Sequence, residues 1–251
     1  MYHAVSDNPA DRSYDPVYAV SSKTFREHLD VISEKGRRVA SLRERLDEAS
    51  PPTAAPIYFT FDDGHVSNLE AAMQLLERDY RADFFVNPGL IGKSCLMSWS
   101  HLTELARKGM SIQSHGMTHE YLDDLSSVEI RADLERSKKT IEDKIGTRVE
   151  IFAPPGGRMT RDVPAIARDL GYRILCTSEP GIVGRRFMRT PRIAVRAHFS
   201  ASHLSAFIEK PRRLVIREKT RYLMLYGAKQ LLGNRGYDAL RSRLLRQGDD
   251  P

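Results

Sequence analysis

Cysteine is scarce in this sequence, and long apolar runs are missing altogether. The two cysteines, Cys95 and Cys176, lie far apart without a CxxC pair, which is typical of reduced, buried thiols and argues against a disulfide framework. No apolar run approaches the roughly 18 residues that span a bilayer, and no basic segment leads into an apolar one at the start. We therefore predict a cytoplasmic protein without a signal peptide in this sequence. Because the chain opens directly on a predicted strand, a longer natural N-terminus stays an open alternative.

Internal repeats and low-complexity stretches are absent as well. Apolar residues make up 41% and charged residues 29% of the 251 residues, values that exclude a disordered or fibrous protein and favour one large α/β domain. Charge, however, is unevenly placed. Residues 211–251 hold ten Lys or Arg and four Asp or Glu, which accounts for the whole formal net charge of +6. We predict a catalytic domain over residues 1–210 and a basic helical extension over residues 211–251.

Strand and helix patterns alternate along the chain. Short apolar runs predict strands, and apolar positions at helical spacing, with capping residues before them, predict helices. The predicted strands are Ile57–Phe61, Ala82–Val86, Met110–Ser114, Val149–Ala153, Tyr172–Thr177 and Arg192–Arg196. The predicted helices are Ser21–Lys35, Asn68–Tyr80, Ser98–Lys108, Ser126–Ile145 and Val163–Leu170. This alternation indicates parallel strands with helical crossovers, in either a barrel or an open doubly wound sheet.

Residues that can take part in catalysis or bind a metal follow several of these strands. Asp62 and Asp63 come directly after one strand, His115 after another, and Pro154–Gly157 after a third. Parallel α/β folds carry their chemistry at the C-terminal ends of the strands, so we expect these residues to lie close together. His119 is four residues beyond His115, a spacing that lets both imidazoles share a metal ion with a carboxylate. A second carboxylate can then accept a proton from water, so the two aspartates offer one group for each task.

Four segments in order carry a family resemblance. They are Tyr58-Phe59-Thr60-Phe61-Asp62-Asp63-Gly64, Ala82-Asp83-Phe84-Phe85-Val86, Ser114-His115-Gly116-Met117-Thr118-His119 and Phe152-Ala153-Pro154-Pro155-Gly156. Together they resemble the polysaccharide deacetylase family, also called the NodB-homology domain or carbohydrate esterase family four, over roughly residues 1–200. The resemblance implies a deformed (β/α) barrel of seven or eight strands. It also implies a divalent metal, usually zinc, and removal of N-acetyl, sometimes O-acetyl, groups from sugars.

The resemblance also implies roles for single residues. Asp62 matches the general base of the family, and Asp63, His115 and His119 match its metal ligands. The substrate groove is expected to be walled by the loop that contains Pro154, Pro155 and Gly156. The expected partner is a glycan that contains amino sugars, for example a polysaccharide, an oligosaccharide or a lipid-linked glycan of the exopolysaccharide type.

The chain departs from the family pattern in two places. Ala153 stands where the family often has an arginine that orients the base, and we consider Arg158 as a replacement. The late histidine that protonates the leaving amine is not clearly present, so His198 is the first candidate and His203 the next. These departures keep two alternatives open. One is a catalytically weak carbohydrate-binding protein, and the other is a deformylase or imidase that acts on another C–N bond.

Two further features leave alternatives open. His3 lies in a Tyr-His-Ala-Val opening similar to the first strand of bacterial exopolysaccharide deacetylases, and it either points into the barrel mouth or packs in the core. From Leu214 to Leu232, apolar and basic residues interleave. This pattern predicts either a helix packed on the barrel with a solvated basic face or an interfacial helix on an anionic membrane. Nucleic acid is not an expected partner, because no recognised nucleic-acid-binding module accompanies the charge.

Overall fold

A computed structural model of the chain describes residues 1–8, 11–48, 56–184, 189–224 and 236. Its centre is a parallel sheet of six strands in the order β10-β9-β8-β7-β6-β5, so that each strand pairs with the next along the chain. The strands are β5 (Thr60–Phe61), β6 (Asp83–Val86), β7 (Ser111–Ser114), β8 (Ile151–Phe152), β9 (Ile174–Cys176) and β10 (Arg189–Thr190). The open doubly wound alternative is thereby excluded, because the strand order never reverses.

The sheet curls toward a barrel, and the N-terminal segment closes it. Tyr2 forms a parallel bridge with Phe61, and β1 (Ala4–Val5) pairs with β2 (Ala19–Val20). On its other side, the backbone of Met1 exchanges hydrogen bonds with Ile193 and Val195, which follow β10. The two edges of the sheet are therefore joined through the first residues of the chain. A second small parallel pair, β3 (Val39–Ala40) with β4 (Ile57–Tyr58), precedes β5.

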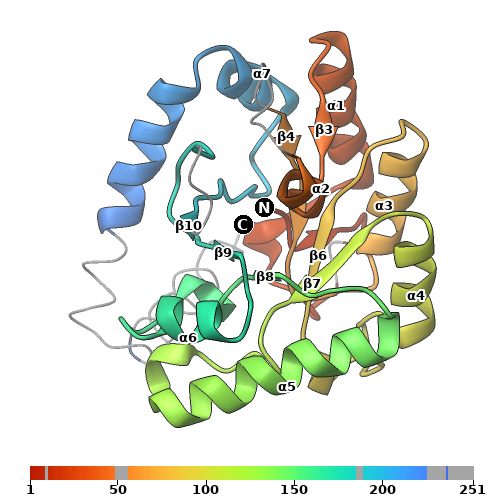
Figure 1. The fold of residues 1–251 in the computed structure, drawn as a ribbon. Helices are drawn as coiled ribbons and strands as arrows, with labels where there is room; N and C mark the ends of the chain where they lie inside the picture. Colours follow the sequence, from red (N-terminus) through yellow and green to blue (C-terminus); the bar gives the residue numbers. More distant parts are fainter. Residues whose placement is uncertain (9–10, 49–55, 185–188, 225–235, 237–251) are drawn as a thin grey trace.

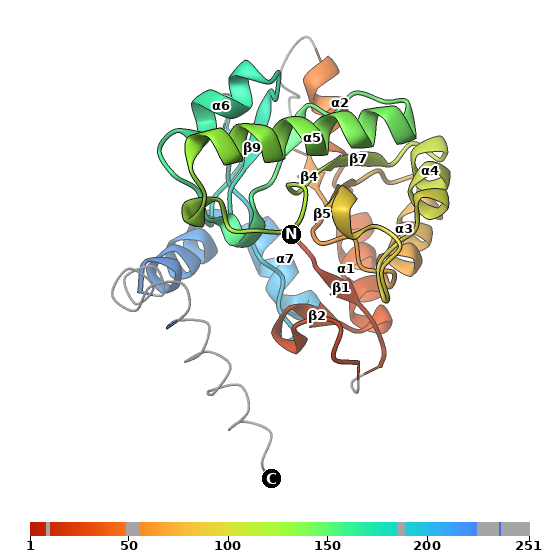
Figure 2. The same ribbon diagram turned by 90° about the horizontal axis from the view of Figure 1, so that it is seen from below.

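Helices surround this curled sheet in both ribbon views (Figures 1 and 2). They are α1 (Ser22–Glu34), α2 (Leu42–Asp47), α3 (Asn68–Leu76), α4 (Trp99–Arg107), α5 (Ser127–Ile145), α6 (Val163–Asp169) and α7 (Ala201–Glu209). Short 3₁₀ turns cover Pro16–Tyr18, Pro88–Leu90, Leu122–Asp124 and Pro155–Gly157. None of the helices in the described part of the chain is both long and apolar enough to cross a membrane.

Apolar side chains fill the space between the strands and the helices. Phe61 of β5 stacks on Phe84 of β6 with ring centroids 4.8 Å apart, and Tyr2 and Phe25 extend this aromatic cluster. All four are buried. Burial of one such side chain stabilises a fold by about 1.5–3 kcal/mol, so the cluster fixes the strand that carries Asp62.

The structure confirms the α/β barrel predicted from the sequence, with corrections at three elements. The single strand expected over Ile57–Phe61 is divided into β4 and β5, which pair in different sheets. The expected strand Arg192–Arg196 is instead β10 at Arg189–Thr190. Its pairing with β9 ends before Pro191, and the chain continues from there toward Met1. The expected helix from Asn68 to Tyr80 ends at Leu76. Three residues later, Asp79 has a left-handed φ of 56°. The amides of Asp79 and Tyr80 donate back to Leu76 and Leu75, the pattern of a Schellman C-terminus.

Asn68 was expected to cap this helix, but α3 begins at Asn68 itself, and the preceding Ser67 makes no side-chain cap bond. In contrast, the predicted capping box of α5 is present. Ser126 accepts from the amide of Glu129, and the Glu129 carboxylate accepts from the amide of Ser126 at 2.8 Å. Gly146 ends α5 with a φ of 77°, as expected of a glycine in the left-handed region.

The Ser126→Ala variant tests this cap. It removes the acceptor for one amide at the start of α5, so the free energy of unfolding should fall by about 1 kcal/mol in a urea titration. Lys139→Ala, an exposed substitution in the same helix, should change it by less than about 0.5 kcal/mol. Equal effects of the two substitutions would contradict a specific role for the cap.

Candidate functional site

The polar residues that follow β5, β7 and β8 meet at one end of the sheet. Asp62 and Asp63 follow β5, His115 follows β7, and the Pro154–Gly157 turn follows β8. The strands are parallel and adjacent, so their C-terminal ends lie side by side. This placement brings together residues that are up to about 90 positions apart in the sequence, as the strand-end argument requires.

The turn after β5 separates the two carboxylates. Asp63 and Gly64 both have a φ of 70°, in the left-handed region that asparagine, aspartate and glycine enter most readily. A side chain at position 64 would also meet Val86, with 3.2 Å between the added Cβ and Cγ1. This turn directs Asp62 into the protein, where it is buried, and leaves Asp63 half-exposed. The adjacent residues therefore face different partners.

Asp63, His115 and His119 form a compact group of ligand atoms. The Oδ1 atom of Asp63 lies 3.2 Å from Nε2 of His115 and 3.2 Å from Nε2 of His119. The three ligand atoms lie within 4.8 Å of one another. Ligands about 2.0–2.2 Å from a tetrahedral zinc ion are spaced roughly 3.3 Å apart, so the spacing suits a metal of this size. The residues form a potential metal-binding triad.

A hydrogen bond behind His115 fixes which of its nitrogens faces the triad. Nδ1 of His115 lies 2.7 Å from the carbonyl oxygen of Ala153, and because a carbonyl can only accept, Nδ1 carries the proton. With the proton on Nδ1, a neutral His115 directs the lone pair of Nε2 at the Asp63 carboxylate. Two electron-rich groups approach this closely only with a cation between them, either a proton or a metal ion. Burial lowers the pKa of His115, but the hydrogen bond to Asp63 and the negative charges of Asp62 and Asp63 together outweigh it and raise this pKa overall.

The Asp63 carboxylate responds to the same contacts in the opposite sense. Burial alone would raise its pKa, but the hydrogen bonds with His115 and His119 hold the pKa well below its ordinary value. Asp63 is therefore ionised at neutral pH. An ionised carboxylate and two imidazoles are the donor set expected for a zinc-like ion with open coordination positions.

The loop that carries the two histidines is anchored by buried polar side chains. Asn87 donates through Nδ2 to the carbonyl of His115 at 2.5 Å, and Ser137 of α5 donates to the carbonyl of Gly116 at 3.1 Å. Asp133, also on α5, accepts from the amide of Met117 at 3.0 Å. His119 has a left-handed φ of 65°, a conformation that persists where surrounding contacts enforce it. Helix α5 thus positions the second ligand.

Asp62 is held by Arg192. The guanidinium donates from Nη1 to Oδ1 at 2.6 Å and from Nη2 to Oδ2 at 2.9 Å, and only 4% of either side chain is exposed. Arg192 also donates to the carbonyl of Thr177 and to the hydroxyl of Thr60. Burial alone would raise the pKa of Asp62, but Arg192 and the nearby histidines lower it overall. Asp62 is therefore kept ionised and in one orientation.

Arg192 is the residue that the sequence analysis missed. It was assigned only to a strand, and Arg158 was considered as the partner of Asp62, but among the described residues Arg192 forms this ion pair. The guanidinium of Arg158 lies over the ring of Tyr121, 3.7 Å from the centroid. The available signal was the charge at Arg192, between Pro191 and the apolar residues 193–195, because a buried arginine requires an anionic partner.

The Pro154–Gly157 turn and Tyr121 line the same end of the barrel. Gly156 has a φ of 61°, and an added Cβ there would lie 2.9 Å from the Tyr121 ring. The Tyr121 and His119 rings are 6.4 Å apart, so the turn stands next to the ligand triad. Pro154 and Pro155 are buried, and Gly156 is exposed. The turn can therefore form a wall beside the triad, as expected for the substrate groove.

His198 and His203, the two candidates for the late histidine of the family, have other surroundings than Asp62 and the triad. Nδ1 of His203 accepts from the amide of Ser200 in the capping box of α7. His198 is exposed, and the charges that act on it are those of Arg196, Arg221, His203 and Glu218. In the described part of the chain, neither histidine contacts Asp62 or the triad.

His3 is a further histidine within electrostatic reach of the site. The charges that act on it are those of Asp63, Asp62, Arg192 and His115, and its ring packs 4.8 Å from the ring of Tyr18. Within the described residues its Nδ1 is buried and has no hydrogen-bond partner. Burial lowers the pKa of His3, and the two carboxylates oppose that effect. Of the two placements considered for His3, the structure supports the barrel mouth.

The coupling of Asp62 with Arg192 can be measured through stability. Arg192→Met leaves a buried carboxylate without its cation, so the free energy of unfolding at pH 7 should fall by about 3–5 kcal/mol in urea. Adding Asp62→Asn should recover part of this loss. At pH 4 the loss should be smaller, because without Arg192 the pKa of Asp62 rises and the carboxyl group takes up a proton. Additive effects at both pH values would show that the pair is not coupled.

A family model described as polysaccharide deacetylase matches residues 49–175, which is half of the chain. The Bacillus subtilis (strain 168) protein YxkH, named as a polysaccharide deacetylase, is 26% identical over 215 residues, covering 83% of this chain and 75% of that protein.

Solved structures show the same fold. The Streptococcus pyogenes deacetylase PplD, in complex with acetate, superimposes with a TM-score of 0.74 at 23% identity, covering 81% of this chain and 94% of that one. IcaB from Ammonifex degensii gives a TM-score of 0.68 at 23% identity over 82% of this chain and 94% of its own. These likenesses confirm the NodB-type α/β barrel. With the family model matching the segment that carries Asp62, Asp63 and both histidines, the chain belongs to the polysaccharide deacetylase family, whose members are hydrolases that act on carbon–nitrogen bonds.

Proposed function

We propose that this protein is a metal-dependent deacetylase that removes N-acetyl groups from the amino sugars of a glycan. The observation that carries the proposal is the pairing of Asp62 with Arg192 directly beside the triad of Asp63, His115 and His119. One carboxylate is ionised and oriented but takes no part in the triad. The other is shared by two imidazoles. This division supplies a base and a metal site from neighbouring residues.

Asp62 is proposed as the general base. Its pKa is held below the ordinary value, so it is ionised at neutral pH and can accept the proton of a water molecule that attacks the acetamide carbonyl. Arg192 occupies one lone pair on each carboxylate oxygen and leaves the others available. Because Arg192 is also tied to Thr60 and Thr177, the orientation of the base is fixed before the substrate arrives.

Asp63, His115 and His119 would hold the metal ion. A donor set with two imidazoles favours zinc or a similar transition metal over magnesium or calcium, and we propose zinc. When bound, such an ion supplies positive charge that polarises the carbonyl and lowers the pKa of nearby water. The carbonyl of Ala153 keeps Nε2 of His115 directed at the ion. The position where the family often has an arginine therefore contributes to the site through its backbone.

His3 is proposed to return the proton to the leaving nitrogen. An amine leaves poorly as an anion, so the C–N bond breaks readily only when a nearby acid protonates the nitrogen. The charges of both carboxylates act on His3, and its buried Nδ1 has no hydrogen-bond partner among the described residues. The Tyr18 ring packs against the imidazole at a tilt of 34° and restricts its rotation. Because the pKa of His3 is lowered, its imidazole is neutral at pH 7, and the proton that Asp62 takes from the attacking water would pass to His3 before His3 gives it to the leaving nitrogen.

The glycan is proposed to lie along the wall made by Pro154, Pro155, Gly156 and Tyr121. Gly156 is exposed there, and the Tyr121 ring fills the space that a side chain at position 156 would need, so a sugar would meet the turn and this ring together beside the triad. The half-exposed side chains of Asp63 and His119 open the triad on the same side. A polysaccharide, an oligosaccharide or a lipid-linked glycan would each fit an open groove of this kind.

The weak-binding alternative loses its main support. It was motivated by the missing arginine at Ala153, and Arg192 supplies that charge from the other edge of the sheet. No observation favours a deformylase or an imidase. The cytoplasmic location stays a prediction. We also propose that the basic C-terminal segment brings the protein to an anionic membrane, where lipid-linked or nascent glycans would be found.

Acetate release tests the function. The purified protein, incubated with N-acetylglucosamine oligomers, should release acetate rather than formate, and a chelator should abolish the release until zinc is restored. Asp62→Asn should bind zinc like the wild type but lose turnover by at least about 100-fold, because the base is gone and the ligands remain. Activity that survives the chelator would refute the metal mechanism, and a wild-type rate in Asp62→Asn would remove Asp62 as the base.

The His3→Gln variant tests the proton donor. On N-acetyl substrates its kcat should fall about 100-fold, whereas hydrolysis of 4-nitrophenyl acetate should hardly change, because nitrophenolate leaves without a proton. His198→Gln is the matched control and should behave like the wild type on both substrates. An equal loss of His3→Gln on both substrates would indicate a structural role instead, and no loss on either would exclude His3 from the reaction.

A further inference from the structure

The helix formed by residues 211–224 turns one side toward the barrel and the other toward solvent (Figure 1). On the inner side, the Glu218 carboxylate pairs with Arg196 at 3.0 Å, and both side chains are 13% exposed. Leu214 and Val215 are also partly covered. Glu218 is the only acidic residue in this stretch. The one negative charge of the helix is therefore directed inward.

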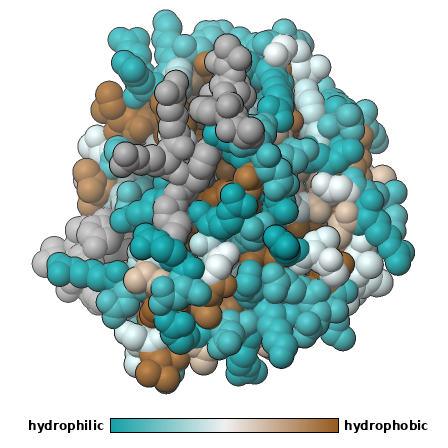
Figure 3. Space-filling model, in the orientation of Figure 1, coloured by the Kyte–Doolittle hydropathy of each residue, from teal (hydrophilic) through white to brown (hydrophobic). Residues whose placement is uncertain are grey.

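The outer side of the helix combines exposed apolar and basic side chains. Ile216, Leu223 and Met224 are 66%, 64% and 67% exposed. Ile216 and Leu223 are seven residues apart, so they lie on the same side of the helix, two turns from each other. The stretch also exposes five cations, of which Arg217 approaches the Glu218 carboxylate at 3.7 Å; they are Arg212, Arg213, Arg217, Lys219 and Arg221. We call these eight side chains the outer face. In the space-filling view, hydrophobic (brown) and hydrophilic (teal) residues lie next to each other along the left edge of the molecule, where Figure 1 shows this helix (Figure 3).

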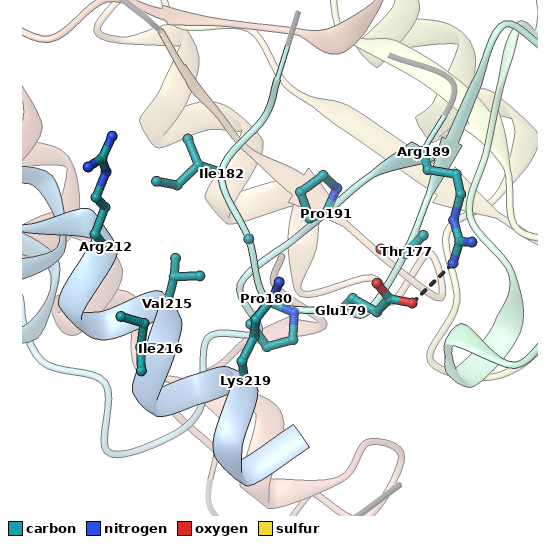
Figure 4. Close-up of a pocket in the computed structure, with 11 residues that line it drawn as sticks. Thr177, Glu179, Pro180, Ile182, Arg189, Pro191, Arg212, Val215, Ile216 and Lys219 are labelled. Carbon is teal, nitrogen blue, oxygen red and sulfur yellow. Dashed lines mark hydrogen bonds and ion pairs between the residues drawn. The ribbon is translucent and has the colours of Figure 1, made fainter. Parts of the chain in front are cut away.

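A pocket of about 470 Å³ separates the helix from the loops around β9 and β10 (Figure 4). Arg212, Ile216 and Lys219 line it from the helix, and Pro191 and the half-exposed Ile182 line it from the opposite side. Glu179 in the same wall pairs with Arg189 at 3.0 Å rather than with a cation of the helix. The helix cations in the pocket therefore keep their positive charge available for an outside partner.

We propose that the outer face docks on an anionic lipid bilayer. Lipid phosphates would neutralise the cations, and Ile216, Leu223 and Met224 would enter the boundary between headgroups and acyl chains. A nucleic acid or another soluble polyanion would use the cations but would leave the apolar side chains in water. A second copy of the chain would place like charges against each other. The bilayer is the partner that satisfies both kinds of side chain.

Docking in this way would set the active site close to the bilayer. Thr177, which lines the pocket beside the helix, accepts a hydrogen bond from Arg192, the partner of Asp62. The outer face and its anionic lipids thus add a membrane surface to the proposed function, and their role in catalysis rests on that function. Binding to lipid can nevertheless be measured without a glycan, so the two proposals fail separately.

Vesicle sedimentation with the full-length protein tests the proposal. The protein should bind vesicles of phosphatidylcholine and phosphatidylglycerol in equal parts, but not vesicles of phosphatidylcholine alone, and added salt should weaken the binding. Arg213→Gln/Arg221→Gln should weaken it roughly 30-fold, because each cation near an anionic surface contributes about fivefold. Arg136→Gln/Lys139→Gln, two exposed cations on α5 with the same change in net charge, should bind like the wild type.

The apolar side chains distinguish a bilayer from a soluble polyanion. Ile216→Asn/Leu223→Asn should lower vesicle binding by about tenfold or more, whereas Val128→Asn, at an 80% exposed apolar residue on α5, should not. Wild-type vesicle binding by Ile216→Asn/Leu223→Asn, or equal binding of the wild type to soluble dextran sulfate, would overturn the proposal. Absence of binding to anionic vesicles would also overturn it. Acetate release from a soluble oligomer, measured without vesicles, reports on the proposed function alone.

Discussion

The ion pair between Asp62 and Arg192 connects the two edges of the sheet. A buried carboxylate is strongly unfavourable unless a cation and further hydrogen bonds accompany it, and Arg192 provides both. The two residues are 130 positions apart in the chain and adjoin β5 and β10, the first and last strands of the six-stranded sheet. They can meet only because the sheet curls and Met1 joins its edges. The ionised, oriented state of Asp62, the proposed base, therefore depends on closure of the barrel.

The neighbouring residue has a different function because of one backbone conformation. The left-handed φ of Asp63 turns its carboxylate away from Asp62 and toward His115 and His119. Gly64 continues this turn at a point where a side chain would press on Val86. Two identical side chains thus differ in role because they differ in surroundings: Asp62 faces a guanidinium, and Asp63 faces two imidazoles. Burial affects both, but their different partners determine what each can do.

Local sequence signals predicted the local features well. The capping box at Ser126 and Glu129 and the glycine at position 146 defined α5, because their hydrogen bonds join residues only a few positions apart. The same logic failed for partners across the barrel. Arg158 and His198 were chosen because they lie near the expected motifs along the chain, yet Arg158 packs over Tyr121, and His198 lies among charges of the C-terminal part. Distance along the chain says little about distance across a curled sheet.

The sequence by itself determined the reaction class and the set of strand ends, because the Asp-Asp-Gly turn, the pair of histidines four apart and the alternating strands and helices are all local patterns. Only the tertiary structure decided which charge supports Asp62 and which histidine faces the site. Arg192 and His3 reach the site from opposite ends of the domain. Their partners are set by how the barrel closes, and closure depends on the packing of the whole sheet rather than on any single segment.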